Sequence, residues 1–259
     1  MASVPVVHVP RRGAPYWVRG FGVMLRWQLA GLRLWATVTI SVEILSGVGM
    51  VYGMGLLVPD IPERAALYVT TGSAVVTTIV VGLILGPQLV AQQKAEHTYD
   101  YLLSMPVRRS ATALSWYVVV VLVGFPGAVA ALVAGSVRFE VPLHVTAVVV
   151  PAWLLAIFTA TMLGYAVAHA ISIPMVTIIL SQVFVFLAFG YAPINFPADQ
   201  MPHWLAETNR FLPFLPMATV VRDGLTRGLA THVAFSYCVL SAWAAGACAV
   251  AGFALGRRR

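Results

Sequence analysis

The sequence predicts an all-α, polytopic membrane protein with six transmembrane helices in a single domain, residues 1–259. The chain is 60% hydrophobic and only 10% charged, with a mean hydropathy of +0.87, whereas a soluble domain is about a quarter charged. Six apolar runs are long enough to cross the hydrocarbon core, which takes about 20 residues each. The charged residues gather in the links between these runs.

An interfacial helix is expected over residues 16–33. Its three arginines, Arg19, Arg26 and Arg33, recur every seven residues and therefore stay near one helical face, among aromatic and apolar neighbours. This pattern is typical of a helix that lies in the membrane interface. The alternative is a basic anchor that only flanks the first span. Residues 1–15 are an irregular start without a following apolar h-region, so we expect no cleaved signal peptide.

The first predicted span, residues 34–58, contains Glu43, which is the only ionisable residue in the middle of any span. A charge at that depth is costly and usually faces protein or a wet cavity. Two interpretations stay open. Glu43 is either a cavity or gate residue, or a structural carboxyl bonded to a neighbouring helix or to a second subunit.

The second span is rich in threonine and serine, and its hydroxyls are expected to bond to their own backbone or to an adjacent helix. Lining a transport path is the alternative. Pro126 is expected to kink the third span. The five further spans are predicted over residues 67–90, 111–137, 145–168, 174–191 and 233–255.

A compact charged segment, residues 94–110, separates the second and third spans. It predicts a short helix over 96–106 with a hard stop. The Thr98 hydroxyl is expected to cap the start, because it can accept a bond from a free amide of the first turn. Pro106 disfavours helical geometry at Met105 and therefore ends the element.

This short helix is predicted to be amphipathic. Tyr99, Leu102 and Leu103 fall at i, i+3 and i+4 and form an apolar face, whereas Asp100 points elsewhere. A short amphipathic helix held between two spans suits docking to a soluble partner. The alternative is a loop on the lipid surface with no partner.

The longest link between spans is residues 192–232. Within it, residues 211–221 are apolar but too few to cross the bilayer, which fits a re-entrant or interfacial piece. Such backbone is tolerated at membrane depth only where it is buried in protein or lines a cavity. Pro213 and Pro216 are expected to break this piece.

Charge placement predicts the orientation. Six spans put both ends on one side, and that side, with the 94–110 segment, holds eleven Lys and Arg residues against five on the other. The positive-inside rule therefore places both termini and the charged segment in the cytoplasm and the 192–232 link outside. The net charge of +7 reflects arginines at the membrane borders, so no nucleic-acid partner is expected.

The motifs of common enzymes are absent from the sequence. There is no phosphate-binding loop, the chain has a single lysine, and the six histidines show no metal-ligand spacing. Cys238 and Cys248, ten residues apart on one predicted helix, do not share a face and are not expected to form a disulfide. We therefore expect no enzyme, no metal site and no cofactor bound by this chain.

Two segments resemble a known family, the permease subunits of ABC-2-type exporters, in the daunorubicin-exporter-like branch. The stretch Glu96-His-Thr-Tyr-Asp-Tyr-Leu-Leu-Ser-Met-Pro-Val-Arg-Arg is similar to the family's acidic-x-Gly-Thr-x-x-x-Leu-Leu-x-x-Pro-Val-Arg segment, with His97 where the family often has glycine. The stretch Pro202-His-Trp-Leu, followed by Pro216 and Arg222-Asp-Gly, resembles a second family segment, with Leu215 in place of asparagine.

The resemblance implies a mechanism. Residues 96–106 would be the coupling helix that inserts into a separate ABC ATPase subunit, 16–33 a connecting helix, and 201–223 the external re-entrant helices. Two permeases, as a homodimer or a heterodimer, would enclose the path and bind two ATPase subunits, which hold ATP and Mg. The coupling residues would be Glu96, Thr98, Tyr99, Asp100, Leu102, Leu103, Pro106 and Arg108.

The resemblance further implies ATP-driven export across the prokaryotic plasma (inner) membrane, as in multidrug or antibiotic efflux. The apolar spans favour an amphipathic drug, antibiotic or lipid-like substrate. A lipid-linked glycan is an alternative within the family. Outside it, the rivals are an ion-coupled secondary transporter or channel that uses Glu43, and a membrane scaffold whose loop binds a partner other than an ATPase.

Overall fold

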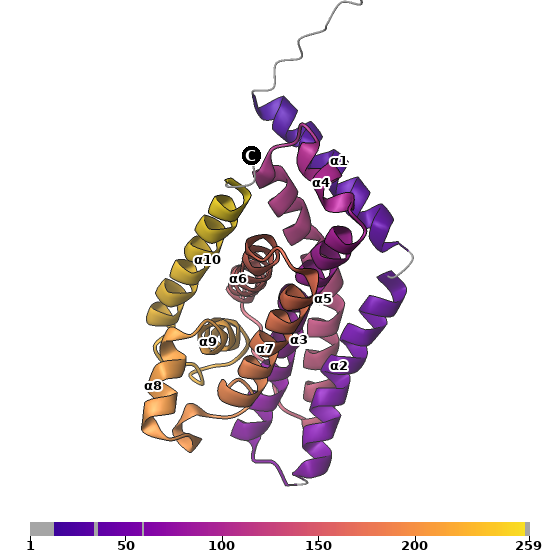
Figure 1. Cartoon of the computed structure of the whole chain (residues 1–259). Helices are drawn as coiled ribbons and strands as arrows, with labels where there is room; N and C mark the ends of the chain where they lie inside the picture. The colour runs from indigo at the N-terminus through magenta and orange to yellow at the C-terminus, as the bar shows by residue number, and fades with distance from the viewer. Residues whose placement is uncertain (1–12, 34–35, 59, 257–259) are drawn as a thin grey trace, which may run out of the picture.

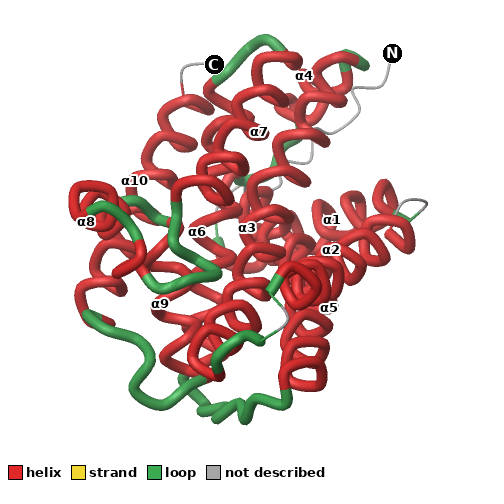
Figure 2. Tube along the Cα trace, turned by 90° about the horizontal axis from the view of Figure 1, so that it is seen from below, coloured by secondary structure: helices red, strands yellow, loops and turns green. Residues whose placement is uncertain are grey.

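A computed structural model of the chain describes residues 13–33, 36–58 and 60–256, without the side chains of Asp100 and Leu103 (Figure 1). Every element in these ranges is a helix or a loop (Figure 2), so the predicted all-α fold is confirmed. The basic residues of the two chain ends lie outside the described ranges; these are Arg11, Arg12, Arg257, Arg258 and Arg259.

Six of the described helices are long and apolar enough to cross a membrane, as predicted. At about 1.5 Å per residue, the 33-residue α3 is about 50 Å long and therefore exceeds the hydrocarbon core of about 30 Å. The six helices are α2 (Ala36–Leu57), α3 (Glu63–Ala95), α5 (Arg109–Phe139), α6 (Val149–Ala170), α7 (Pro174–Tyr191) and α10 (Val233–Gly256).

The shorter helices lie at the two ends of this bundle. Helix α1 and helix α4 are at the end where α10 finishes, and α8 lies toward the opposite end with α9 beside it (Figure 1). The shorter elements are α1 (Ala14–Leu32), α4 (Thr98–Ser104), the 3-10 turn η1 (Ala198–Gln200), α8 (His203–Phe211) and α9 (Phe214–Leu225).

Helix α3 forms the centre of the molecule. It packs against α2, α5, α6, α7 and α9. In its most apolar stretch of 18 residues, 72% of the residues are buried, whereas the corresponding share is 22% in α2 and α7 and 28% in α10. In Figure 2, α1 and α2 lie on one side of α3, and α8, α9 and α10 lie on the other. The outer helices therefore present their apolar side chains to lipid or to another subunit.

Small residues allow the helices to approach closely. A Cβ placed on Gly135 of α5 would overlap the Thr70 side chain of α3, and one placed on Gly127 would lie 2.9 Å from Cβ of Glu43 on α2. Close approach at glycine is the common way for membrane helices to gain van der Waals contact. The contacts of α5 with α2 and α3 therefore depend on these two residues having no side chain.

The start of the fourth span and the effect of Pro216 differ from the predictions. The fourth span begins at Val149 rather than Val145, because the amides of His144 and Thr146 bond to the carbonyls of Leu225 and Gly224 at 2.9 Å instead of starting a helix. Pro216 does not break the apolar piece 211–221, because it lies in the first turn of α9, where proline is tolerated. Pro213 does interrupt this piece, since it directly precedes α9.

We expect Gly135→Ala to destabilise the permease. The added methyl group overlaps Thr70, and overpacking of this kind costs about 1–3 kcal/mol, which corresponds to a melting temperature lower by about 3–10 °C. Thermal unfolding in detergent measures the change. Gly246→Ala on α10 is the matched control, because a Cβ there meets no atom within 4 Å. Equal melting temperatures for the two variants would contradict this account of the α3–α5 contact.

Candidate functional site

The turn between α3 and α4 depends on one residue with left-handed backbone geometry. His97 has φ 58° and ψ 15° and directly precedes α4. Non-glycine residues adopt this region at a cost, because Cβ approaches the following carbonyl. The position therefore favours glycine, which the similar family segment often has where this chain has His97.

Of the two predictions for the ends of α4, the one for its start is wrong and the one for its end is confirmed. The predicted Thr98 cap is wrong, because α4 has no side-chain cap and the Thr98 hydroxyl donates instead to the Gln93 carbonyl of α3 at 3.2 Å. The stop at Pro106 is confirmed: α4 ends at Ser104, and Met105 is extended with ψ 139°. Thr98 thus links α4 back to the end of α3.

The inner face of α4 is packed into the molecule. Tyr99 is only 5% exposed, contacts Val90 and Ala168, and has its ring centroid 5.8 Å from that of His169. His169, also buried, has its centroid 3.9 Å from that of Tyr165 on α6. The three rings therefore form a continuous contact from α4 to the last turns of α6.

The charge of Lys94 also holds α4 and the end of α6 together. Its ammonium group donates to the carbonyls of Ala168 and Ile171 at the end of α6, and lies 5.0 Å from the centre of the Tyr99 ring. A cation is favourable at a helix C-terminus and over an aromatic face. The only lysine in the chain therefore joins the end of α3 to the end of α6 and to α4.

The opposite face of α4 is open. Tyr101 is 67% exposed, and Glu96 and Arg108 are exposed on either side of the helix. Glu96 accepts a hydrogen bond from the Gln92 amide at 2.7 Å. Leu102 is half-buried and lines a cavity of about 70 Å³ between α4, α1 and the ends of α5 and α6. The side chains of Asp100 and Leu103 lie outside the described part.

Helix α1 lies across the start of α5. Its Trp17 indole donates to the Ser110 hydroxyl at 3.0 Å, and its buried face is made of Met24, Gln28 and Leu32. Neither amide atom of Gln28 has a hydrogen-bond partner among the described residues. The predicted arginine face is exposed and consists of Arg19, Arg26 and Arg33.

Glu43 lies in the α2–α5 contact and not with the residues of α4. It is 5% exposed, and a Cβ on Gly127 would lie 3.0 Å from its backbone carbonyl. Its Oε2 is buried and has no hydrogen-bond partner in the described ranges. Glu43 therefore faces protein rather than lipid.

Arg222 is a buried cation that the sequence did not identify as a site. Arg222 of α9 donates from Nε to the Thr71 hydroxyl at 3.1 Å and from Nη2 to the Ile194 carbonyl at 2.6 Å. Its guanidinium carbon lies 4.1 Å from the ring centre of Tyr68. The only indication of this site in the sequence is that Arg222 directly follows the apolar residues 211–221. Arg222 joins α9, α3 and the segment after α7.

Comparison with known proteins gives one family. The family model described as ABC-2 family transporter protein matches residues 44–253, which is most of the 259-residue chain. No individual curated protein gives a significant match. The matched range begins within α2, contains the complete α3–α4–α5 unit, and ends within α10. The chain therefore belongs to the ABC-2 family of transporters, as a multi-pass permease subunit of an ABC transporter.

Proposed function

We propose that the chain is the permease of an ATP-driven exporter of the daunorubicin-exporter-like branch, and that α4 is its coupling helix. The main support for the proposal is the position of α4. It connects α3 and α5, the two longest helices, and its Tyr99 packs on His169. A helix fixed in this way can transmit a displacement. The chain itself binds no cofactor in this scheme, and ATP and Mg belong to the partner ATPase.

The proposed assembly contains two permeases and two ABC ATPase subunits in a prokaryotic plasma membrane. Both termini and α4 face the cytoplasm, because that side has eleven Lys and Arg residues against five. Helices α8 and α9 are then the external re-entrant elements. This orientation puts α4 on the side where ATP is available.

We assign different tasks to the two faces of α4. The sequence hypothesis gave the docking area to Tyr99, Leu102 and Leu103, but Tyr99 is buried and Leu102 is half-buried. We therefore assign the docking area to the exposed face around Tyr101, with Glu96 and Arg108 setting its orientation. Tyr99 and Leu102 instead anchor the helix to the permease.

The contacts that anchor α4 provide a route by which movement of the ATPases could reach the spans. Closure of the ATPases would press on α4, and the Tyr99–His169 contact and the Lys94 bonds to the end of α6 would carry that displacement into α6 and α3. Most residues in the apolar stretches of α3 and α6 are buried, so these helices cannot shift without repacking their neighbours. Coupling also requires the two membrane states to differ in their contacts with the ATPase.

The exposed faces of the spans support the proposed substrate class. A groove of about 550 Å³ lies between α6, α7 and α10, and no charged side chain lines it. This lining suits an amphipathic drug, an antibiotic or a lipid-like molecule better than a lipid-linked glycan. The residues that line it include Leu163, Val167, Leu180, Trp243 and Val250.

Tyr101→Ala is expected to weaken ATPase association at least tenfold, because exposed tyrosines at the centre of an interface often contribute more than about 1.4 kcal/mol. Co-purification of the ATPase from mildly solubilised membranes measures this effect. Tyr52→Ala is the control, since Tyr52 is also exposed but lies on α2. If both variants retain the ATPase equally, Tyr101 does not belong to the docking area.

Tyr99→Ala is expected to separate docking from transport. The ATPase should co-purify within about twofold of the wild-type amount, whereas transport in proteoliposomes should fall about tenfold, because the contact with His169 is lost. Tyr99→Phe keeps the ring and should retain most of the transport. Loss of ATPase binding in Tyr99→Ala to the extent seen in Tyr101→Ala would return Tyr99 to the docking area.

Glu43→Gln distinguishes the exporter from an ion-coupled transporter. If the carboxyl is structural, assembly and ATP-driven transport should stay within about twofold of wild type, because glutamine keeps the shape of the side chain. The measurement is substrate flux with the ATPase present, and proton-driven flux with the ATPase absent. Proton-driven flux in the wild type that disappears in Glu43→Gln would favour the secondary transporter.

A further inference from the structure

Arg222 carries a positive charge in a buried place. Its side chain is 2% exposed, and burial lowers its pKa to about 10, so the guanidinium stays protonated at neutral pH. Both hydrogen-bond partners, the Thr71 hydroxyl and the Ile194 carbonyl, are neutral. The Tyr68 ring adds a cation–π contact without neutralising the charge.

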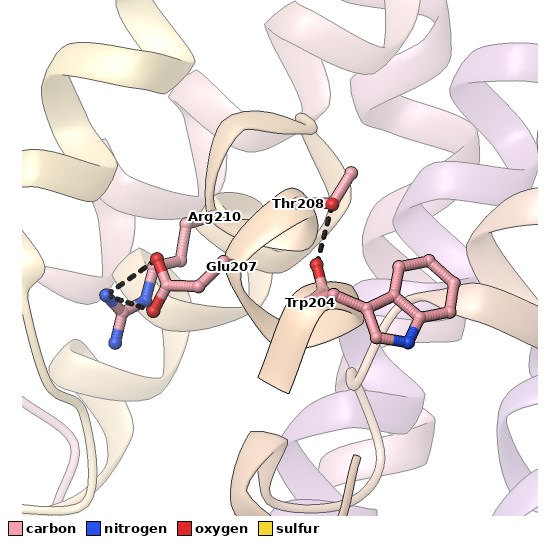
Figure 3. A network of polar contacts seen from close by, with 4 residues as sticks. All are labelled: Trp204, Glu207, Thr208 and Arg210. Carbon is pink, nitrogen blue, oxygen red and sulfur yellow. Dashed lines mark hydrogen bonds and ion pairs between the residues drawn. The ribbon is translucent and has the colours of Figure 1, made fainter. Parts of the chain in front are cut away.

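No carboxylate balances this charge in the described part of the chain. Glu207 is the acidic residue on α8, and it pairs with Arg210 at 2.9 Å (Figure 3). Asp223 follows Arg222 directly and therefore leaves α9 in another direction, toward Tyr237. Arg222 donates hydrogen bonds from Nε and Nη2, and its Nη1 has no hydrogen-bond acceptor among the described residues.

A pocket of about 90 Å³ opens beside Arg222, between α9, the start of α10 and the loop that joins them. Arg210 reaches it from α8, on the side of that helix away from the Trp204 indole (Figure 3). His232 and Thr219 also line it, and no aspartate or glutamate does. Because Arg210 is paired with Glu207 and the Thr219 hydroxyl donates to the Leu215 carbonyl at 3.0 Å, the unbalanced positive charge at the pocket is that of Arg222.

We propose that this pocket binds an oxyanion of the phosphate class. The guanidinium group has a planar set of N–H donors that matches phosphate oxygens, and low local polarity strengthens such a charge-assisted bond. A bound oxyanion would supply the counter-charge that Arg222 lacks. The phosphate can come from a lipid headgroup or from solution, and the chemistry of recognition is the same.

Ligand-dependent thermal stability of the complete permease in neutral detergent tests the site. Sodium phosphate is compared with sodium chloride at equal ionic strength, and short-chain phosphatidylglycerol with a neutral detergent of equal chain length. Saturating ligand should raise the melting temperature by at least about 4 °C. A rise with the lipid alone assigns the site to a headgroup, and a rise with both shows that the oxyanion suffices. No rise with either ligand overturns the proposal.

Two variants and a control locate the effect. Arg222→Gln removes the charge, but it also changes the bonds to Thr71 and Ile194. Thr219→Leu keeps Arg222 and fills the pocket, so it tests the site independently. Arg227→Gln is the control, because Arg227 is exposed and does not line the pocket. The ligand-induced rise should disappear in both pocket variants and persist in the control, and its persistence in Thr219→Leu would place the ligand elsewhere.

Discussion

The close packing of α3 is the constraint on which the rest of the structure depends. Lipid tails are as apolar as the side chains of the helices, so association within a membrane relies on van der Waals contact rather than on removal from water. Glycine provides that contact along α3. A Cβ on Gly82 would lie 2.6 Å from Cβ of Ala160 on α6, and Gly135 of α5 leaves room for Thr70. Helix α3 therefore has little freedom to shift relative to α5 and α6.

Helix α3 also takes part in two groups of polar contacts, one around Lys94 and one around Arg222. Near its end, Lys94 binds the last carbonyls of α6. Near its start, Tyr68 and Thr71 hold Arg222, and a Cβ on Gly72 would lie 2.5 Å from the Ile194 carbonyl that accepts from the same arginine. The helix is about 50 Å long and is held by polar contacts near both of its ends. One helix, α3, thus contributes residues to both the α4 end and the Arg222 end of the molecule.

The parts that the sequence predicted are those determined by local chemistry. Six apolar runs are long enough to span a bilayer and do become helices, and Pro106 stops α4 by a steric effect on its neighbour. The inward face of α4 depends on tertiary contacts. A helix of seven residues makes two turns, and apolar side chains lie on both of its faces, with Tyr99 buried and Tyr101 exposed. Its periodicity alone could not distinguish them, and it could not reveal the left-handed His97 either.

The hydroxyl groups of α3 restrict where a substrate can pass. Thr71 donates to the Leu67 carbonyl at 2.7 Å, and Thr77 and Thr78 both donate to the Ala74 carbonyl, as the sequence favoured. These side chains are fully or almost fully buried between helices, so they do not face an open channel. Because the centre of the permease is packed in this way, it offers no open route, and the least buried spans are α2, α7 and α10. The exposed faces of these spans are open in the single chain, which is the physical reason for the proposed pairing of two permeases, since a second subunit would cover them.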